Sequence, residues 1–200
     1  NLRIISQMAV GIDNIDVRHA TQKGIIVGNT PGVLTETTAD LAWALLMAVA
    51  RRVVEAHNEV QQGIWRPWGP FVLCGQDLFG ATLGVVGLGR IGQAVARRAA
   101  GFSMKVLYSN PRRNPEAEAR LGAEYVSLDE LLARSDYISL HTYLSSQTRQ
   151  MISYEQFARM KPNAILINTA RGAVVDTAAL IEALQQGKIA GAGLDVTDPE

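Results

Sequence analysis

Short apolar runs alternate with helix-like segments from Thr82 to the end of the chain. Each run has the length of a buried strand, and the segments between them show the helical repeat of apolar positions. This alternation predicts an α/β fold with a doubly wound parallel sheet, in which ligands bind at the carboxyl ends of the strands. The predicted strands are Leu83–Val86, Lys105–Ser109, Glu124–Val126, Tyr137–His141, Ala164–Asn168 and Ala190–Asp195.

The first third of the chain follows a different pattern. Two strands are predicted, at Leu2–Ser6 and Ile25–Val27, with a helix at Asp16–Gln22 between them. Apolar positions then recur at helical spacing over Thr35–Gln62. They predict one long helix, ended by Gly63, that bridges two domains.

The segment Ile64–Phe79 is predicted to be irregular and contains Trp65 and Trp68. We expect these tryptophans to cover an edge of the core. The alternative is that one of them lines a substrate cleft or a subunit contact.

A glycine-rich turn links the first strand of the alternating region to its helix. Gly87, Gly89 and Gly92 have the G-x-G-x-x-G spacing of a dinucleotide-binding βαβ unit, with Arg90 and Ile91 between them. Gly87 would allow the tight turn, Gly89 would let the backbone approach a pyrophosphate, and Gly92 would let helix and strand pack closely. The pyrophosphate would lie on the free N–H groups at the helix N-terminus.

The end of the second strand predicts which dinucleotide is bound. An NAD site expects Asp or Glu there, but this chain has Ser109 and Asn110, followed by Arg112 and Arg113. Guanidinium groups suit a 2′-phosphate, which a carboxylate would repel. We therefore predict that NADP(H) is preferred over NAD(H). The alternative is that the arginines are a solvated surface pair.

Composition excludes several classes of protein. The 200 residues carry 19 basic and 19 acidic side chains, with no like-charge run of the kind that binds nucleic acid or a membrane surface. The longest apolar run, Leu41–Ala50, is too short to span a bilayer. The single cysteine, Cys74, excludes a disulfide framework and favours the cytoplasm. No metal-ligand spacing occurs. Both ends look cut, so we expect an internal part of a longer protein.

Three loops follow strand ends at the predicted ligand edge: His141–Thr148, Asn168–Gly172 and Asp195–Glu200. Arg171 lies in the second of them, between a buried strand and a glycine. An arginine at this edge needs an anion to face, such as a substrate carboxylate or a polarised carbonyl. An interdomain salt bridge is an equally good interpretation of its position.

Two of these loops also carry a family signature. The run Met160–Asp176, together with Ala192–Val196 and the following Pro199-Glu200, closely resembles the signature of the D-2-hydroxyacid dehydrogenases. Val10–Asp13 and Thr30–Glu36 resemble the same family, so the likeness covers nearly the whole chain. Within it, Leu107–Arg113 is similar to the glyoxylate/hydroxypyruvate (2-ketogluconate) reductase branch, which uses NADPH.

The resemblance implies a role for several residues. Arg171 would bind the 2-oxo acid and orient its carbonyl, while the N–H groups of Val10 and Gly11 would hold its carboxylate. Glu200 would pair with a catalytic histidine that lies beyond this chain and would raise the pKa of its imidazole. The remaining cofactor contacts would come from His141, Thr142, Thr148, Thr169, Ala170 and Asp195, with Asp195 on the nicotinamide carboxamide.

The resemblance also implies an organisation for the chain. Residues 1–35 would end the N-terminal part of a flavodoxin-like substrate domain, 36–65 would form an interdomain helix and linker, and 66–200 would form a Rossmann-type cofactor domain. The protein would be a homodimer acting on a small 2-oxo acid. Tyr143 stands where the family usually has proline, which leaves the shape of that loop open.

Two other functions remain open from the sequence. Corepressors that resemble this family bind NAD(H) as a sensor, although Arg112 and Arg113 argue against NAD(H) sensing. Another dehydrogenase on the same scaffold, acting on formate or phosphite, is the second alternative.

Overall fold

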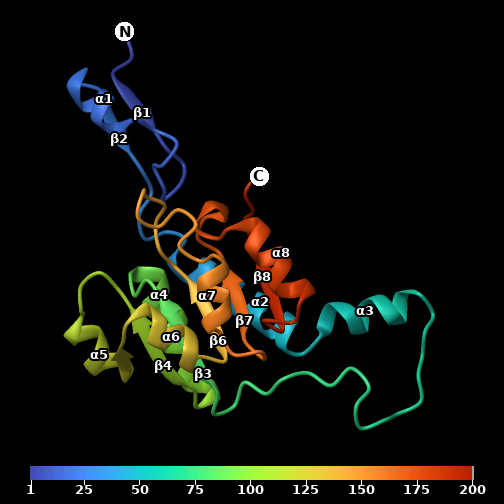
Figure 1. The fold of residues 1–200 in the computed structure, drawn as a ribbon. Coiled ribbons are helices and arrows are strands. Elements are labelled where there is room, and N and C mark those ends of the chain that lie inside the picture. The colour runs from blue at the N-terminus through green and yellow to red at the C-terminus, as the bar shows by residue number, and fades with distance from the viewer. Residues whose placement is uncertain (200) are drawn as a thin grey trace.

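The computed structural model describes residues 1–199, and their centre is a six-stranded parallel sheet (Figure 1). The strand order is β5-β4-β3-β6-β7-β8, so the chain leaves β3 toward one edge and returns to build the other. This is the order of a Rossmann-type doubly wound sheet, and it confirms the predicted fold class. The strands are β3 (Thr82–Val86), β4 (Lys105–Ser109), β5 (Ala123–Tyr125), β6 (Tyr137–Leu140), β7 (Ile165–Asn168) and β8 (Gly191–Leu194).

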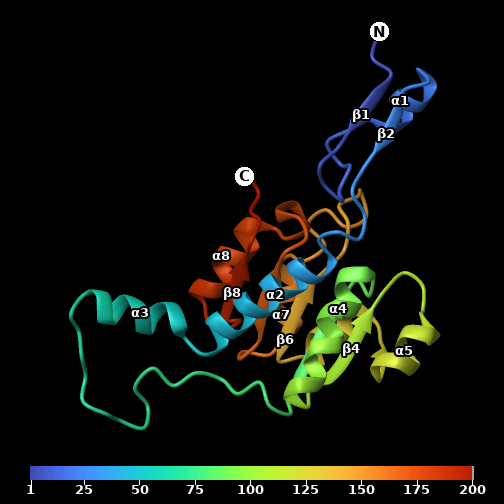
Figure 2. The ribbon, with the colours of Figure 1, turned by 180° about the vertical axis from the view of Figure 1, so that it is seen from behind.

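Helices cover both faces of the sheet and bury separate apolar cores. Figure 1 shows α6, α7 and α8 over one face, and Figure 2 shows α2 and α4 over the other. Every residue of β6 and β7 is buried, which explains why these strands are mostly apolar, with Ser139 and Asn168 as their polar members. The helical segments are α2 (Thr35–Ala50), α4 (Arg90–Ala99), α5 (Pro115–Leu121), α6 (Leu128–Arg134), α7 (Tyr154–Arg159) and α8 (Thr177–Gln185), with short 3₁₀ turns η1 (Ala100–Phe102) and η2 (Gly172–Val174).

The N-terminal segment forms a small unit apart from the large sheet (Figure 1). It consists of β1 (Ile4–Ser6), α1 (Val17–Gln22) and β2 (Ile26–Gly28), and its two strands pair in parallel. Asp16 caps α1 by accepting a hydrogen bond from the His19 N–H at 2.8 Å. The loop that follows β1 carries Val10–Asp13 and reaches the carboxyl edge of the large sheet.

The predicted long helix over Thr35–Gln62 is wrong, because the chain forms two helices with a break at Arg51 and Arg52. Arg52 has φ 52°, in the left-handed region, and α3 (Val53–Gln61) begins directly after it. At the break, the Ala50 carbonyl accepts a hydrogen bond from the Gln76 N–H at 2.8 Å. A contact with a distant loop therefore accompanies the end of α2, which the helical repeat could not reveal.

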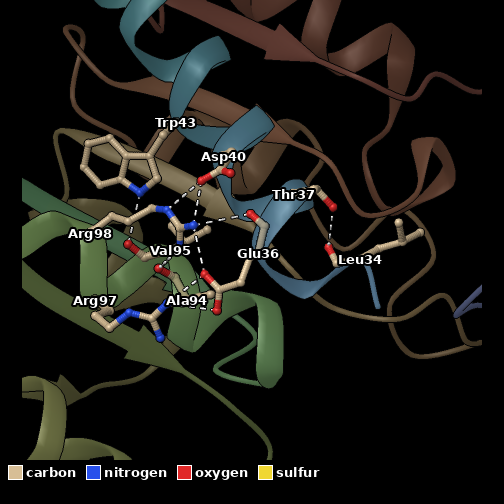
Figure 3. A network of polar contacts seen from close by, with 9 residues as sticks. All are labelled: Leu34, Glu36, Thr37, Asp40, Trp43, Ala94, Val95, Arg97 and Arg98. Carbon is tan, nitrogen blue, oxygen red and sulfur yellow. Dashed lines mark hydrogen bonds and ion pairs between the residues drawn. The ribbon is translucent and has the colours of Figure 1, made fainter. Parts of the chain in front are cut away.

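A network of polar contacts fixes α2 against α4, the helix that follows the glycine-rich turn (Figure 3). Arg98 pairs with Asp40 and with Glu36, which also pairs with Arg97 at 2.7 Å. The buried Trp43 donates its indole N–H to the Val95 carbonyl at 3.0 Å. The α2 helix therefore supports the element that begins the predicted cofactor site.

The segment after α3 forms an extended arm that projects from the body in both ribbon views (Figures 1 and 2). The exposed fraction is 83% for Trp65 and 90% for Trp68. The expectation that these tryptophans cover an edge of the core is therefore wrong. Within residues 1–199, no helix combines the length and apolar character needed to cross a bilayer.

Candidate functional site

A cavity of about 420 Å³ lies at the carboxyl edge of the large sheet, beside the point where the strand order reverses. That point, between β3 and β6, is where doubly wound sheets bind their ligands. The loops after β6 and β7, the start of α4 and the segment after β1 all contribute to the wall. The lining residues are Val10, Gly11, Ile12, Asp13, Ile91, His141, Thr142, Tyr143, Leu144, Thr169, Ala170 and Arg171.

The glycine-rich turn has the geometry that its sequence predicts. Gly87 has φ 98°, and a Cβ there would lie 2.7 Å from the carbonyl of His141. A Cβ on Gly92 would lie 2.1 Å from the Gly87 carbonyl oxygen, so α4 touches the turn that follows β3. A Cβ on Gly89 would meet no atom within 4 Å. The turn is thus closely packed at Gly87 and Gly92 and open at Gly89.

Asn110 has a role in this turn that the sequence analysis missed. Its side-chain oxygen accepts a hydrogen bond from the Leu88 N–H at 2.7 Å, which ties the end of β4 to the turn after β3. The sequence analysis weighed Asn110 only against the carboxylate of NAD sites. The signal for this role was a polar side chain at the end of β4, the strand that pairs with β3 next to the turn.

The two arginines after Asn110 differ in their surroundings. Arg113 makes two-pronged contacts with Glu118, the shortest at 2.7 Å, and Tyr108 donates its hydroxyl to the same carboxylate. Arg113 and Tyr108 together lower the pKa of Glu118 to about 2. Arg112 is exposed, and the described part of the chain offers it neither a hydrogen bond nor an ion pair. Arg112 is therefore the better placed of the two to meet a phosphate.

His141 lies in the cavity wall but is not an acid at neutral pH. Burial lowers the pKa of its imidazole to about 4, and its Nε2 lies 2.8 Å from the Ser139 hydroxyl. A neutral ring cannot supply the proton that an imidazolium would.

The described residues fit a dinucleotide at this edge of the sheet. The α4 helix has Gly89 at its N-cap without a side-chain cap, and the position of a Gly89 side chain is open space. On the far side, the buried Thr169 hydroxyl has no hydrogen-bond partner within the described residues. A buried hydroxyl without a partner is costly, and a ligand group in the cavity would satisfy it.

Arg171 faces the cavity and pairs with Asp13 from the N-terminal unit. Its Nε lies 3.1 Å from each Asp13 carboxylate oxygen, and its Nη2 lies 2.9 Å from Oδ1. Its Nη1 donates to the Ala170 carbonyl at 2.7 Å. Arg171 therefore makes a salt bridge to the N-terminal unit, in the same cavity that would hold a substrate anion. The sequence analysis did not identify Asp13 as its partner.

Asn168, another residue that the sequence analysis missed, shapes the loop that carries Arg171. Its side-chain amide donates to the Arg171 carbonyl at 2.9 Å, and its oxygen accepts from the Ala170 N–H at 3.0 Å. The side chain is buried at the end of β7. A buried asparagine at the end of an apolar strand was the signal for this role.

Comparison with known proteins decides the family. Residues 43–200 match the model of the D-isomer specific 2-hydroxyacid dehydrogenase NAD-binding domain. The chain belongs to the D-isomer specific 2-hydroxyacid dehydrogenase family. The resemblance noted from the signature runs is thereby confirmed.

The whole chain aligns with similar members of this dehydrogenase family. The chain is 59% identical to glyoxylate reductases of Thermococcus litoralis and Korarchaeum cryptofilum, and it covers 61% and 60% of their respective lengths. A solved structure from Thermus thermophilus matches all of the chain with TM-score 0.93 and 53% identity, over 62% of that protein. A glyoxylate reductase structure from Paecilomyes thermophila matches 99% of the chain and 60% of that protein, with TM-score 0.90 and 41% identity. The chain thus spans about three fifths of the length of these dehydrogenases.

The cavity brings together only part of the residues predicted for the dehydrogenase site. Val10, Gly11, Ile91, His141, Thr142, Thr169, Ala170 and Arg171 line it. Ser109, Asn110, Arg112 and Arg113 lie at the end of β4 and in the loop after it, and Asp195 is exposed after β8. The Thr148 hydroxyl instead closes the loop after β6, donating to the Tyr143 carbonyl at 2.7 Å, and Tyr143 is exposed. Glu200 lies outside the described residues.

Proposed function

We propose that the complete protein reduces a small 2-oxo acid to the D-2-hydroxy acid, with glyoxylate, hydroxypyruvate or 2-ketogluconate as substrate and NADP(H) preferred. One observation carries this proposal: Arg171 lines a cavity at the switch point of the sheet, directly beside the backbone of Gly11, and Val10 lines the same cavity. The glyoxylate reductases that are 59% identical to this chain support the choice of substrate class.

The chain's own residues would bind and orient the acid. Within the described residues, the N–H groups of Val10 and Gly11 have no hydrogen-bond acceptor, so they are available to a substrate carboxylate. Arg171 would direct N–H groups toward the carbonyl oxygen, where negative charge develops as the carbon is reduced. The turn at Gly87–Gly92 would hold the dinucleotide, with Thr169 and His141 beside the nicotinamide.

The remaining chemistry comes from two sources. A bound nicotinamide would supply the hydride that reduces the carbonyl carbon. The proton would come from a histidine beyond this chain, paired with Glu200, because a carboxylate partner favours the imidazolium form. Neutral His141 would then help to exclude water from the cavity instead of donating a proton.

Steady-state assays on the full-length protein test this function. We expect NADPH oxidation to depend on glyoxylate, hydroxypyruvate or 2-ketogluconate and to yield the D-isomer where the product is chiral. Tight NADPH binding without turnover of any of the three acids would contradict the proposal and favour the sensor alternative. Turnover of formate or phosphite with NADP⁺ would instead favour the other dehydrogenases.

The preference for NADPH is tested by changing the end of β4. Asn110→Asp combined with Arg112→Ala should lower the NADPH-to-NADH ratio of kcat/KM by about 10–100-fold, because one charged contact is lost and a repulsive carboxylate is added. An aspartate can still accept the hydrogen bond from Leu88, so the turn should remain intact. Arg113→Ala is the control, since Arg113 is engaged by Glu118. An unchanged ratio in the double variant would refute the preference.

We also propose that the protein is a homodimer and that the arm after α3 takes part in the contact. Trp65, Trp68 and Phe71 are at least 83% exposed on this arm, and large exposed apolar residues mark interaction sites. In sedimentation equilibrium, the full-length protein should have the mass of two copies. Replacing the three side chains by serine should shift it toward one copy, and a monomeric unmodified protein would refute the proposal.

A further inference from the structure

The ion pair between Asp13 and Arg171 joins residues that are 158 positions apart in the chain. Within the described residues, N–H groups on all three guanidinium nitrogens of Arg171 donate to Asp13 or to the Ala170 carbonyl. Asp13 engages the edge formed by Nε and Nη2, and the Ala170 carbonyl engages Nη1. The plane of the guanidinium is therefore held from two sides.

The backbone of the N-terminal unit completes this arrangement. A Cβ placed on Gly11 would lie 1.6 Å from Nη2 of Arg171, so the guanidinium rests directly against that glycine. Asp13 and Gly11 belong to the same cavity wall as Arg171. The segment that would hold a substrate carboxylate through its N–H groups thus also sets the direction of the arginine.

A purely structural role does not account for this pair. About a third of each side chain is exposed, 35% for Arg171 and 36% for Asp13, and pairs this open to water contribute little to stability. A carboxylate beside the guanidinium also reduces the net positive charge that an anionic substrate meets. Fixing the direction of the guanidinium would be a benefit large enough to offset this loss of attraction.

We propose that Asp13 is a positioning residue, whose carboxylate holds the Arg171 guanidinium in the orientation that meets the carbonyl oxygen of a bound 2-oxo acid. This role rests on the proposed function, because it acts through the binding of such an acid. If charge alone mattered, removing the Asp13 carboxylate would strengthen the binding of an anionic acid, and the positioning role predicts the opposite. Removing Asp13 should weaken the binding of an anionic acid, although the site becomes more positive.

The first test uses Asp13→Ala and Asp13→Asn in the full-length protein. Asp13→Ala should lower kcat/KM for glyoxylate by up to about 100-fold, because displacing a catalytic contact by about 1 Å has effects of this size. Asp13→Asn keeps one acceptor oxygen, so its kcat/KM for glyoxylate should lie between the values of Asp13→Ala and the unmodified protein. The affinity for NADPH should be the same in both variants. Asp16→Ala is the control, because it removes the cap of α1 in the same unit without contacting Arg171.

A double variant tests whether Asp13 acts through Arg171. Adding Asp13→Ala to Arg171→Ala should change kcat/KM by no more than about twofold, because the group that Asp13 positions is already gone. Full additivity of the two effects would overturn the positioning role. So would an Asp13→Ala protein with unchanged kcat/KM, or one in which the loss equals that of Asp16→Ala.

A binding measurement separates this role from the proposed reaction. Calorimetric titration with oxalate, a stable dicarboxylate of similar size to glyoxylate, should give at least about tenfold weaker binding to Asp13→Ala than to the unmodified protein. Unchanged or tighter oxalate binding would overturn the positioning role whether or not the protein reduces glyoxylate. Absence of glyoxylate turnover in the unmodified protein would overturn the proposed substrate alone, and the oxalate titration would still decide the role of Asp13.

Discussion

Replacing Arg171 by lysine in the full-length protein is expected to lower kcat/KM for glyoxylate by about 10²–10³-fold, the usual loss when a donor to a developing oxyanion is removed. Lysine keeps the charge but lacks the planar fork. One ammonium group cannot contact Asp13, donate to the Ala170 carbonyl and face the cavity in the way that the guanidinium does. Stopped-flow measurement of NADPH oxidation would show whether the loss lies in the reduction step.

The control for this variant is Arg159→Lys, an arginine that pairs with Asp129 on the surface, away from the cavity. It should behave like the unmodified protein. The affinity for NADPH, measured by fluorescence, should be the same in both variants. An Arg171→Lys protein that keeps its kcat/KM would show that the positive charge alone matters, and the geometric account of this site would be wrong.

Replacing Gly92 by alanine is expected to lower the free energy of unfolding by about 3 kcal/mol or more. The new methyl group would lie 2.1 Å from the Gly87 carbonyl oxygen and 3.1 Å from Val85. The first obstacle is backbone in a turn, which cannot move aside as a flexible side chain would. Either the turn or the start of α4 must shift, so dinucleotide binding should be lost together with stability. Urea denaturation followed by circular dichroism measures the change.

Gly89→Ala is the matched control for that result, because it makes the same change three residues earlier in the same turn. Gly89 has φ −75° and ψ −163°, which alanine adopts without strain, and its added methyl would meet no atom. Stability should change by less than about 0.5 kcal/mol. The affinity for NADPH should fall at least tenfold, since the methyl would occupy the space where backbone meets pyrophosphate. Equal loss of stability in both variants would contradict the packing assigned to this turn.

The alternating half of the molecule was predictable because each of its signals is local. The mostly apolar strands β6 and β7 are buried on both faces, and the spacing of Gly87, Gly89 and Gly92 directly encodes one turn. The parallel doubly wound sheet followed from the alternation itself, whereas the strand order came only from the structure. The resemblance to the family indicated that Arg171 binds the substrate. Its position in the sequence alone did not decide between a substrate anion and a salt bridge as its partner.

The features that sequence analysis missed depend on contacts between distant segments. The break after α2 lies where the Ala50 carbonyl bonds to Gln76, and the helical repeat continues through it. The pairing of Asp13 with Arg171 spans 158 residues, so no local pattern announces it. Trp65 and Trp68 were expected to cover an edge of the core, but among residues 1–199 they are 83% and 90% exposed.

The most direct test of the central claim follows the hydrogen atom that is transferred. The full-length protein would be given glyoxylate and NADPH carrying two deuterium atoms at C4 of the nicotinamide, and the glycolate formed would be analysed by mass spectrometry. Direct reduction predicts one carbon-bound deuterium in each glycolate molecule, with the transfer lost when Arg171 is replaced by alanine. Glycolate without deuterium, or no glycolate despite tight NADPH binding, would contradict the account.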